Sequence, residues 1–102
     1  MELTADDKIN ELNAPHERLG HQLRQIRVAH ELKQVDVEFL TREIAEREDN
    51  PDFVVSNSRL SAIEHGHVRP GTGKLLALGE IYNLTREDLM KLWSTIKPRW
   101  AR

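Results

Sequence analysis

The chain has 102 residues and no cysteine, which fits a single domain with a modest core and excludes disulfides and thiolate zinc sites. No apolar run approaches the roughly 18 residues that span a membrane, and the acidic, polar N-terminus is unlike a signal peptide, so we expect a cytoplasmic protein. The net charge of −2 does not exclude a polyanionic partner, because the acidic residues gather in residues 1–14 and 36–52 and leave residues 15–30 and 53–74 locally basic.

Residues 1–15 are predicted to form a leader outside the main domain. Thr4 could cap a short helix that carries Ile9 and Leu12 and ends at Pro15. A loosely ordered segment fits the same residues equally well, so the sequence leaves both interpretations open.

Two helices are predicted next, one over residues 16–30 and one from about residue 34 to 47. Residues 32–34 form the corner between them, and the polar cluster at residues 48–52 ends the second helix. Each helix has an apolar stripe at the 3.6-residue spacing of an amphipathic helix. The stripes consist of Leu19, Leu23 and Ile26 in the first helix and of Val37, Leu40 and Ile44 in the second.

A third helix is predicted from Ser56 to about residue 65. Ser56 is a good N-cap, and Val55 before it can pack on Leu60 as a hydrophobic staple. Gly66 suits the left-handed position that follows a helix C-terminus. With Leu60 and Ile63 facing inward, the outward face holds small polar residues, which suggests a surface that closely approaches a partner. These outward residues are Ser58, Ser61, Ala62 and His65.

The last two predicted helices complete an all-α bundle of five helices over residues 16–97, followed by a short tail at residues 98–102. The fourth carries its apolar residues at helical spacing, and the fifth starts with Thr85 and Asp88 arranged as a capping box. The inward residues are Leu75, Leu78 and Tyr82 in the fourth helix and Leu89, Leu92, Trp93 and Ile96 in the fifth, which Pro98 ends.

Several short patterns together resemble the lambda-repressor-like helix-turn-helix domains, the Cro/C1 or XRE type, over about residues 18–93. The patterns are Leu23-x-x-x-Arg27, Leu32-x-Gln34, Ser56 through Ile63-Glu64-x-Gly66, and Pro70. The resemblance implies a five-helix bundle that binds double-stranded DNA, usually as a dimer, with its third helix in the major groove. It also implies a structural ion pair between Arg27 of the first helix and Glu64 of the third.

One departure from the family concerns the connection between the second and third helices. The family uses a tight turn with a glycine, whereas about a dozen additional residues intervene here, at residues 42–55, without any glycine. We therefore expect a longer second helix and a loop, and the angle at which the third helix meets DNA stays open.

Candidate base-reading residues lie on the third helix, where Asn can bond adenine, Ser can donate or accept, and the Ala methyl can contact thymine. They are Asn57, Ser58, Ser61 and Ala62. The resemblance assigns phosphate binding to Gln34 at the start of the second helix, and nearby basic residues are further candidates. The candidate phosphate contacts are Lys33, Gln34, Arg59, His65, Arg69 and Lys74. An ordinary exposed helix with solvated charges is the alternative.

Other motifs fail. The segment Gly71-Thr-Gly-Lys74 lacks the first glycine of a phosphate-binding loop, the following Ser or Thr, and a preceding strand. His65 and His67 have no third metal ligand beside them. No nucleophile is paired with a base, so we predict neither an enzyme nor a cofactor or metal.

The sequence thus favours a sequence-specific transcriptional regulator, a repressor, that binds DNA as a homodimer. The residues left to form a dimer contact are Trp93, Ile96 and Trp100, or Ile9 and Leu12 of the leader. A protein-interaction module that uses the acidic residues 36–52 is one alternative, and the antitoxin of a toxin–antitoxin pair is another.

Overall fold

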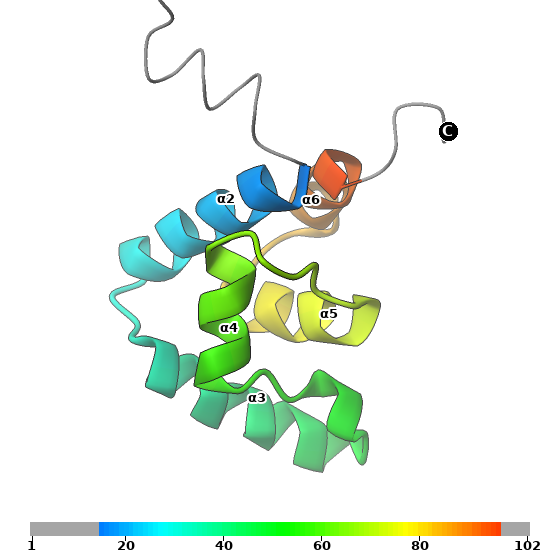
Figure 1. The fold of residues 1–102 in the computed structure, drawn as a ribbon. Helices are drawn as coiled ribbons and strands as arrows, with labels where there is room; N and C mark the ends of the chain where they lie inside the picture. Colours follow the sequence, from blue (N-terminus) through cyan, green and yellow to red (C-terminus); the bar gives the residue numbers. More distant parts are fainter. Residues whose placement is uncertain (1–14, 97–102) are drawn as a thin grey trace, which may run out of the picture.

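The computed structural model describes the backbone of residues 15–96 and the side chains of residues 17–92, and within this part of the chain every regular element is helical (Figure 1). The elements are α2 (Pro15–Ala29), α3 (Gln34–Glu48), the 3-10 turn η1 (Pro51–Phe53), α4 (Asn57–Glu64), α5 (Thr72–Ile81) and α6 (Arg86–Ile96). The predicted all-α bundle of five helices is confirmed. The predicted leader helix, the tail and Trp100 lie outside the described residues, as do the side chains of Trp93 and Ile96.

The predicted lengthening between the second and third helices is present. Helix α3 continues to Glu48 and ends at Asp49, which takes a left-handed conformation with φ of 51°. Residues 49–56, including η1, then lead into α4, so the connection is a loop rather than a tight turn (Figure 1).

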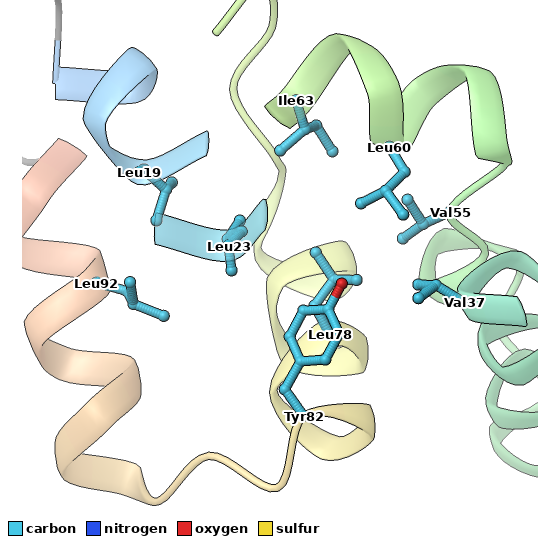
Figure 2. Close-up of a cluster of buried hydrophobic side chains, with 9 residues drawn as sticks. All are labelled: Leu19, Leu23, Val37, Val55, Leu60, Ile63, Leu78, Tyr82 and Leu92. Carbon is cyan, nitrogen blue, oxygen red and sulfur yellow. The ribbon is translucent and has the colours of Figure 1, made fainter. Parts of the chain in front are cut away.

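A single core joins all five helices and the loop before α4 (Figure 2). Most of the predicted apolar stripes contribute to it, and Val55 and Leu60, the proposed staple, are both fully buried. The core side chains are Leu19, Leu23, Val37, Val55, Leu60, Ile63, Leu78, Tyr82 and Leu92. Because α4 contributes Leu60 and Ile63 to this core, its opposite side is turned outward.

The inner face of α3 differs in one position from the predicted stripe. Leu40 is only half-buried, while Thr41 is completely buried beside Val37 and Ile44. A buried hydroxyl needs hydrogen-bond partners, and Thr41 finds them in its own helix and in the loop before α4. Thr41 lies four residues after Val37 and three before Ile44, on the buried stripe of the helix, and these bonds satisfy its hydroxyl there.

Two glycines allow α2 to approach α4 and the segment after it very closely. A Cβ at Gly20 would overlap the carbonyl oxygen of Ile63 and lie 3.0 Å from that of Glu64. Gly66 has φ of +77°, and a Cβ there would lie 2.7 Å from the Cα of Glu17. The C-terminal end of α4 is thus held by backbone-to-backbone packing that side chains would prevent.

The predicted helix caps are confirmed at α4 and α6. The Ser56 Oγ accepts a hydrogen bond from Arg59 N at 3.1 Å, and Gly66 takes the left-handed conformation after α4. Thr85 and Asp88 form the reciprocal capping box, with N–H to oxygen distances of 3.0 and 3.1 Å. Acceptance of the Thr85 N–H lowers the pKa of the Asp88 carboxyl.

Candidate nucleic-acid interface

Helix α4 carries the four predicted base-reading residues on the side away from its buried Leu60 and Ile63. Asn57 and Ser58, at the start of the helix, are exposed, whereas Ser61 and Ala62, one turn later, are half-buried. The spacing of four residues places them in one stripe, opposite the buried Leu60. The stripe is narrow and lacks long side chains, so another surface can approach the helix backbone.

An ion pair fixes the C-terminal end of α4. Arg27 of α2 donates to both carboxylate oxygens of Glu64, from Nε at 2.7 Å and from Nη2 at 2.9 Å. Its Nη1 donates to the carbonyl of Leu32 at 2.8 Å, and the side chains of the pair are only 11% and 1% exposed. The bonded carboxylate raises the pKa of Arg27, although burial opposes the shift. The pair implied by the family resemblance is therefore present in the structure.

Gln34, a predicted phosphate contact, belongs to the same network. Its Nε2 donates to Glu64 Oε1 at 3.1 Å, and the residue is half-buried at the start of α3. A carboxamide nitrogen carries two hydrogens, so one bond to Glu64 orients the group and leaves a second hydrogen for another acceptor. The network joins α2, α3 and α4 beside the outward face of α4.

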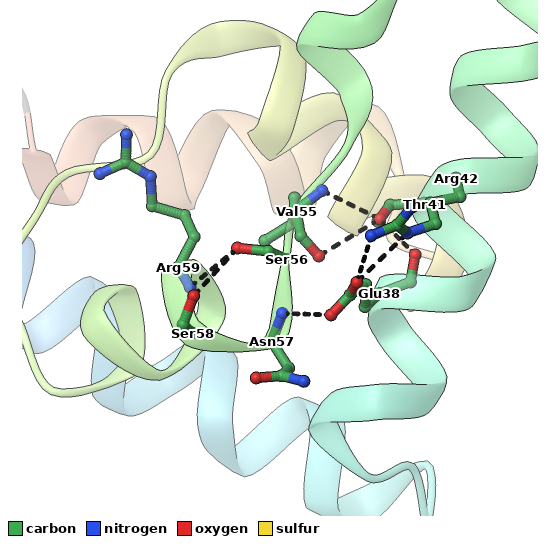
Figure 3. A network of polar contacts seen from close by, with 8 residues as sticks. All are labelled: Glu38, Thr41, Arg42, Val55, Ser56, Asn57, Ser58 and Arg59. Carbon is green, nitrogen blue, oxygen red and sulfur yellow. Dashed lines mark hydrogen bonds and ion pairs between the residues drawn. The ribbon is translucent and has the colours of Figure 1, made fainter.

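The N-terminal end of α4 is bound to α3 through a carboxylate (Figure 3). Glu38 Oε1 accepts the backbone N–H of Asn57 at 2.7 Å, while its Oε2 lies 2.6 Å from Nη2 of Arg42. The Asn57 N–H, and after it Arg42, hold the pKa of Glu38 below its usual range. A carboxylate at a helix N-terminus is also favoured by the helix dipole.

The loop before α4 is bound to both neighbouring helices. Val55 N donates to Thr41 Oγ1 at 2.9 Å, and the Thr41 hydroxyl in turn lies 2.9 Å from the carbonyl oxygen of Glu38. From α5, Lys74 Nζ donates to the carbonyl oxygen of Val54 at 2.7 Å. The loop therefore reaches α4 along a path fixed by hydrogen bonds.

A protein-family model described as a helix-turn-helix domain matches residues 18–92. The chain belongs to this family. The match confirms the family predicted from the sequence, and it suggests DNA binding. Neither the comparison with curated proteins nor the comparison with solved structures found a match.

The predicted phosphate contacts of this helix-turn-helix domain differ in exposure and in the bonds that they make within the protein. Lys33, Arg59 and Arg69 are exposed, as a phosphate contact requires. His65 is also exposed, but its Nδ1 lies 2.8 Å from the carbonyl oxygen of Ser61, so only Nε2 is directed elsewhere. Lys74 is half-buried, and its ammonium group donates to the carbonyl oxygens of Asp52 and Val54 in the loop, so two of its three N–H donors are used within the protein.

Sequence reasoning missed three residues of α3 that bind the loop before α4 and the first residue of α4, or support that contact, namely Glu38, Thr41 and Arg42. The spacing of Glu38 and Arg42 is the i,i+4 arrangement of a helical ion pair, and this was the one available signal. Nothing in the sequence indicated that the same carboxylate would accept the Asn57 N–H from another helix.

None of the helices between residues 15 and 96 is both long and apolar enough to cross a bilayer. In the same part of the chain, no three His, Asp or Glu side chains are close enough together to hold a metal ion.

Proposed function

We propose that the protein is a sequence-specific DNA-binding transcriptional regulator that acts as a repressor. The observation that carries the proposal is the outward face of α4, which is polar, narrow and held at both ends inside a helix-turn-helix domain. In this motif the third helix of the bundle enters the major groove. The proposed partner is double-stranded DNA, which also favours a cytoplasmic location.

The proposed contacts divide into two classes with different consequences. The polar stripe on α4 reads base edges, whereas the exposed cations around it, together with Gln34, bind phosphate and set the register. The base-reading residues are Asn57, Ser58, Ser61 and Ala62, and the phosphate contacts are Lys33, Gln34, Arg59, His65 and Arg69. Sequence discrimination therefore depends on uncharged side chains.

The proposal predicts different salt behaviour for the two classes. Asn57→Ala should weaken binding to a site selected from random DNA by about 1–3 kcal/mol and leave binding to random duplexes unchanged. Arg59→Ala should weaken binding to both duplexes alike and reduce the slope of log affinity against log salt by roughly one unit. The measurement is a salt titration of both variants on both duplexes.

Arg24→Gln serves as the control for loss of a positive charge, because Arg24 is exposed on α2, outside α3 and α4 and outside the groove between α5 and α6. This control variant should bind both duplexes with the affinity and the salt dependence of wild type. A wild-type protein that binds neither duplex at about 50 mM salt, where electrostatic binding is strong, would contradict the proposal. If Asn57→Ala and Arg59→Ala behaved alike, the assignment of α4 as the reading helix would be wrong.

We further propose a homodimer, because the motif reads two half-sites about one DNA turn apart through a two-fold pair. Leu76 of α5 and Met90 of α6 are large exposed apolar residues beside one shallow groove between these helices, which supports an apolar contact there. Sedimentation equilibrium with a duplex carrying two half-sites should give two chains per duplex. A single 11.8 kDa chain per duplex at saturation would contradict the dimer.

One observation favours a protein partner as a second candidate function. The acidic segment around the end of α3 is largely exposed, and its carboxylates would repel phosphate if they faced DNA. The exposed acidic residues are Glu43, Glu46, Glu48, Asp49 and Asp52. A basic protein surface is the complementary partner, and this reading would replace the DNA proposal if the titration showed no DNA binding.

A further inference from the structure

We infer that Glu38 and Thr41 are positioning residues for DNA reading, because they fix the start of α4 in place of the glycine turn that the chain lacks. The inference deepens the proposed function and rests on it. We define the loop clamp as Glu38 and Thr41 together with the two residues whose backbone N–H groups they accept, Val55 of the loop and Asn57 at the start of α4.

The first step concerns the order of the contacts along the chain. Moving towards α4, the carbonyl oxygen of Val54 meets Lys74, the N–H of Val55 meets Thr41, and the N–H of Asn57 meets Glu38. The intervening Ser56 caps α4 itself. The backbone is thus bound in the residues that lead to the base-reading stripe and at the first residue of the stripe, Asn57 (Figure 3).

The second step concerns what a loop would do without these bonds. A tight turn fixes the crossing of two helices through its own geometry, whereas the eight residues 49–56 have many more conformations. Hydrogen bonding to base edges requires side chains held within about 0.5 Å and 10–20° of the productive geometry. The clamp supplies the missing constraint from α3, which is a rigid element.

The third step concerns charge. A lone carboxylate beside the start of a major-groove helix would repel the DNA backbone, but Arg42 Nη2 lies 2.6 Å from Glu38 Oε2 and balances it. The Glu38 side chain is only 20% exposed, while that of Arg42 is 63% exposed. The positive partner is therefore the one presented to solvent, and Glu38 can hold Asn57 without opposing DNA.

The test compares two substitutions that remove the same charge. Glu38→Ala loses the acceptor for Asn57 N, whereas Glu38→Gln retains an oxygen that can accept this bond. We measure the ratio of affinities for a selected site and for a random duplex. Glu38→Ala should lower this ratio about tenfold, the effect of one lost hydrogen bond to a charged group, and Glu38→Gln should stay within about twofold of wild type.

Thr41 provides a second, independent pair of substitutions for the same test. Thr41→Val keeps the shape but removes the acceptor for Val55 N, and Thr41→Ser keeps the hydroxyl. The ratio should fall for the valine variant and be retained by the serine variant. Circular dichroism melts identify the folded temperature range in which all four variants are compared.

Asp88→Ala is the control for general destabilisation, because Asp88 accepts a backbone N–H at the start of α6 in the same way, without contacting α4. Its affinity ratio should equal that of wild type. An equal fall for Asp88→Ala and Glu38→Ala would overturn the inference, as would a folded Glu38→Ala variant with an unchanged ratio. A wild-type chain that binds no duplex overturns the proposed function instead, and the inference falls with it.

Discussion

Arg27→Ala is expected to lower the free energy of unfolding by about 3–5 kcal/mol, because it leaves the carboxylate of Glu64 buried without its partner. The side chain of Glu64 is 1% exposed, and it would lose both bonds from the guanidinium while keeping the weaker one from the uncharged Gln34. For a domain of this size, the melting temperature should fall by more than about 10 °C. Thermal unfolding followed by circular dichroism measures the change.

Arg47→Ala is the matched control for this prediction. Arg47 pairs with Glu80 at the same 2.7 Å distance, but both side chains are at least half exposed, and exposed pairs contribute little. The melting temperature of Arg47→Ala should stay close to that of wild type. Adding Glu64→Gln to Arg27→Ala should recover part of the loss, since the lone buried charge is its main cause. If Arg27→Ala melted like Arg47→Ala, this explanation would be wrong.

Gly20→Ala is expected to destabilise the fold by about 1–3 kcal/mol, the usual effect of overpacking. Alanine normally favours a helix over glycine by about 1 kcal/mol, so the sign of the effect is informative. The added methyl group would meet backbone oxygens of Ile63 and Glu64, which cannot rotate away as a side chain could. Helix α4 must move, and affinity for the selected DNA site should therefore fall as well.

Gly71→Ala is the control for Gly20→Ala, because a Cβ at Gly71 would meet no atom within 4 Å. Gly71 is the N-cap of α5, where alanine is less favourable than glycine, so the variant's free energy of unfolding in urea should fall by no more than about 1 kcal/mol. A Gly20→Ala variant as stable as Gly71→Ala would show that α2 and α4 are not in backbone contact.

The sequence predicted those features whose signals lie within a few residues of one another. Ser56, Gly66 and the pair Thr85 and Asp88 were recognisable because capping depends on local spacing. The apolar stripes predicted the core for the same reason. The ion pair of Arg27 and Glu64 spans 37 residues, and only the resemblance to a known family indicated it.

The remaining features depend on which helices approach each other, which no local pattern encodes. A buried threonine such as Thr41 is recognised only when the loop residue it binds, Val55, is known to lie beside it. From the sequence alone, Lys74 is indistinguishable from an exposed surface lysine. Its bond to the loop can be recognised only once α5 is known to pack against the loop. In the sequence, Gly20 only lowers the helix propensity of a predicted helix. The need for glycine at this position is evident only from the structure, in which the backbone of α4 packs against it. The boundaries of the leader and tail stay predictions.

The exposed turn at Asp49 is the place where this chain can change length at little cost. The residues of the loop and of α4 that bind Lys74 of α5 and the side chains of α3 all follow it, starting with Asp52, whose carbonyl oxygen accepts from Lys74 Nζ. The entropy of closing a loop grows only slowly with its length, so added residues at this turn would leave the start of α4 where it is. A fluorescent label or a short fused peptide placed at Asp49 should therefore leave the position of α4 unchanged.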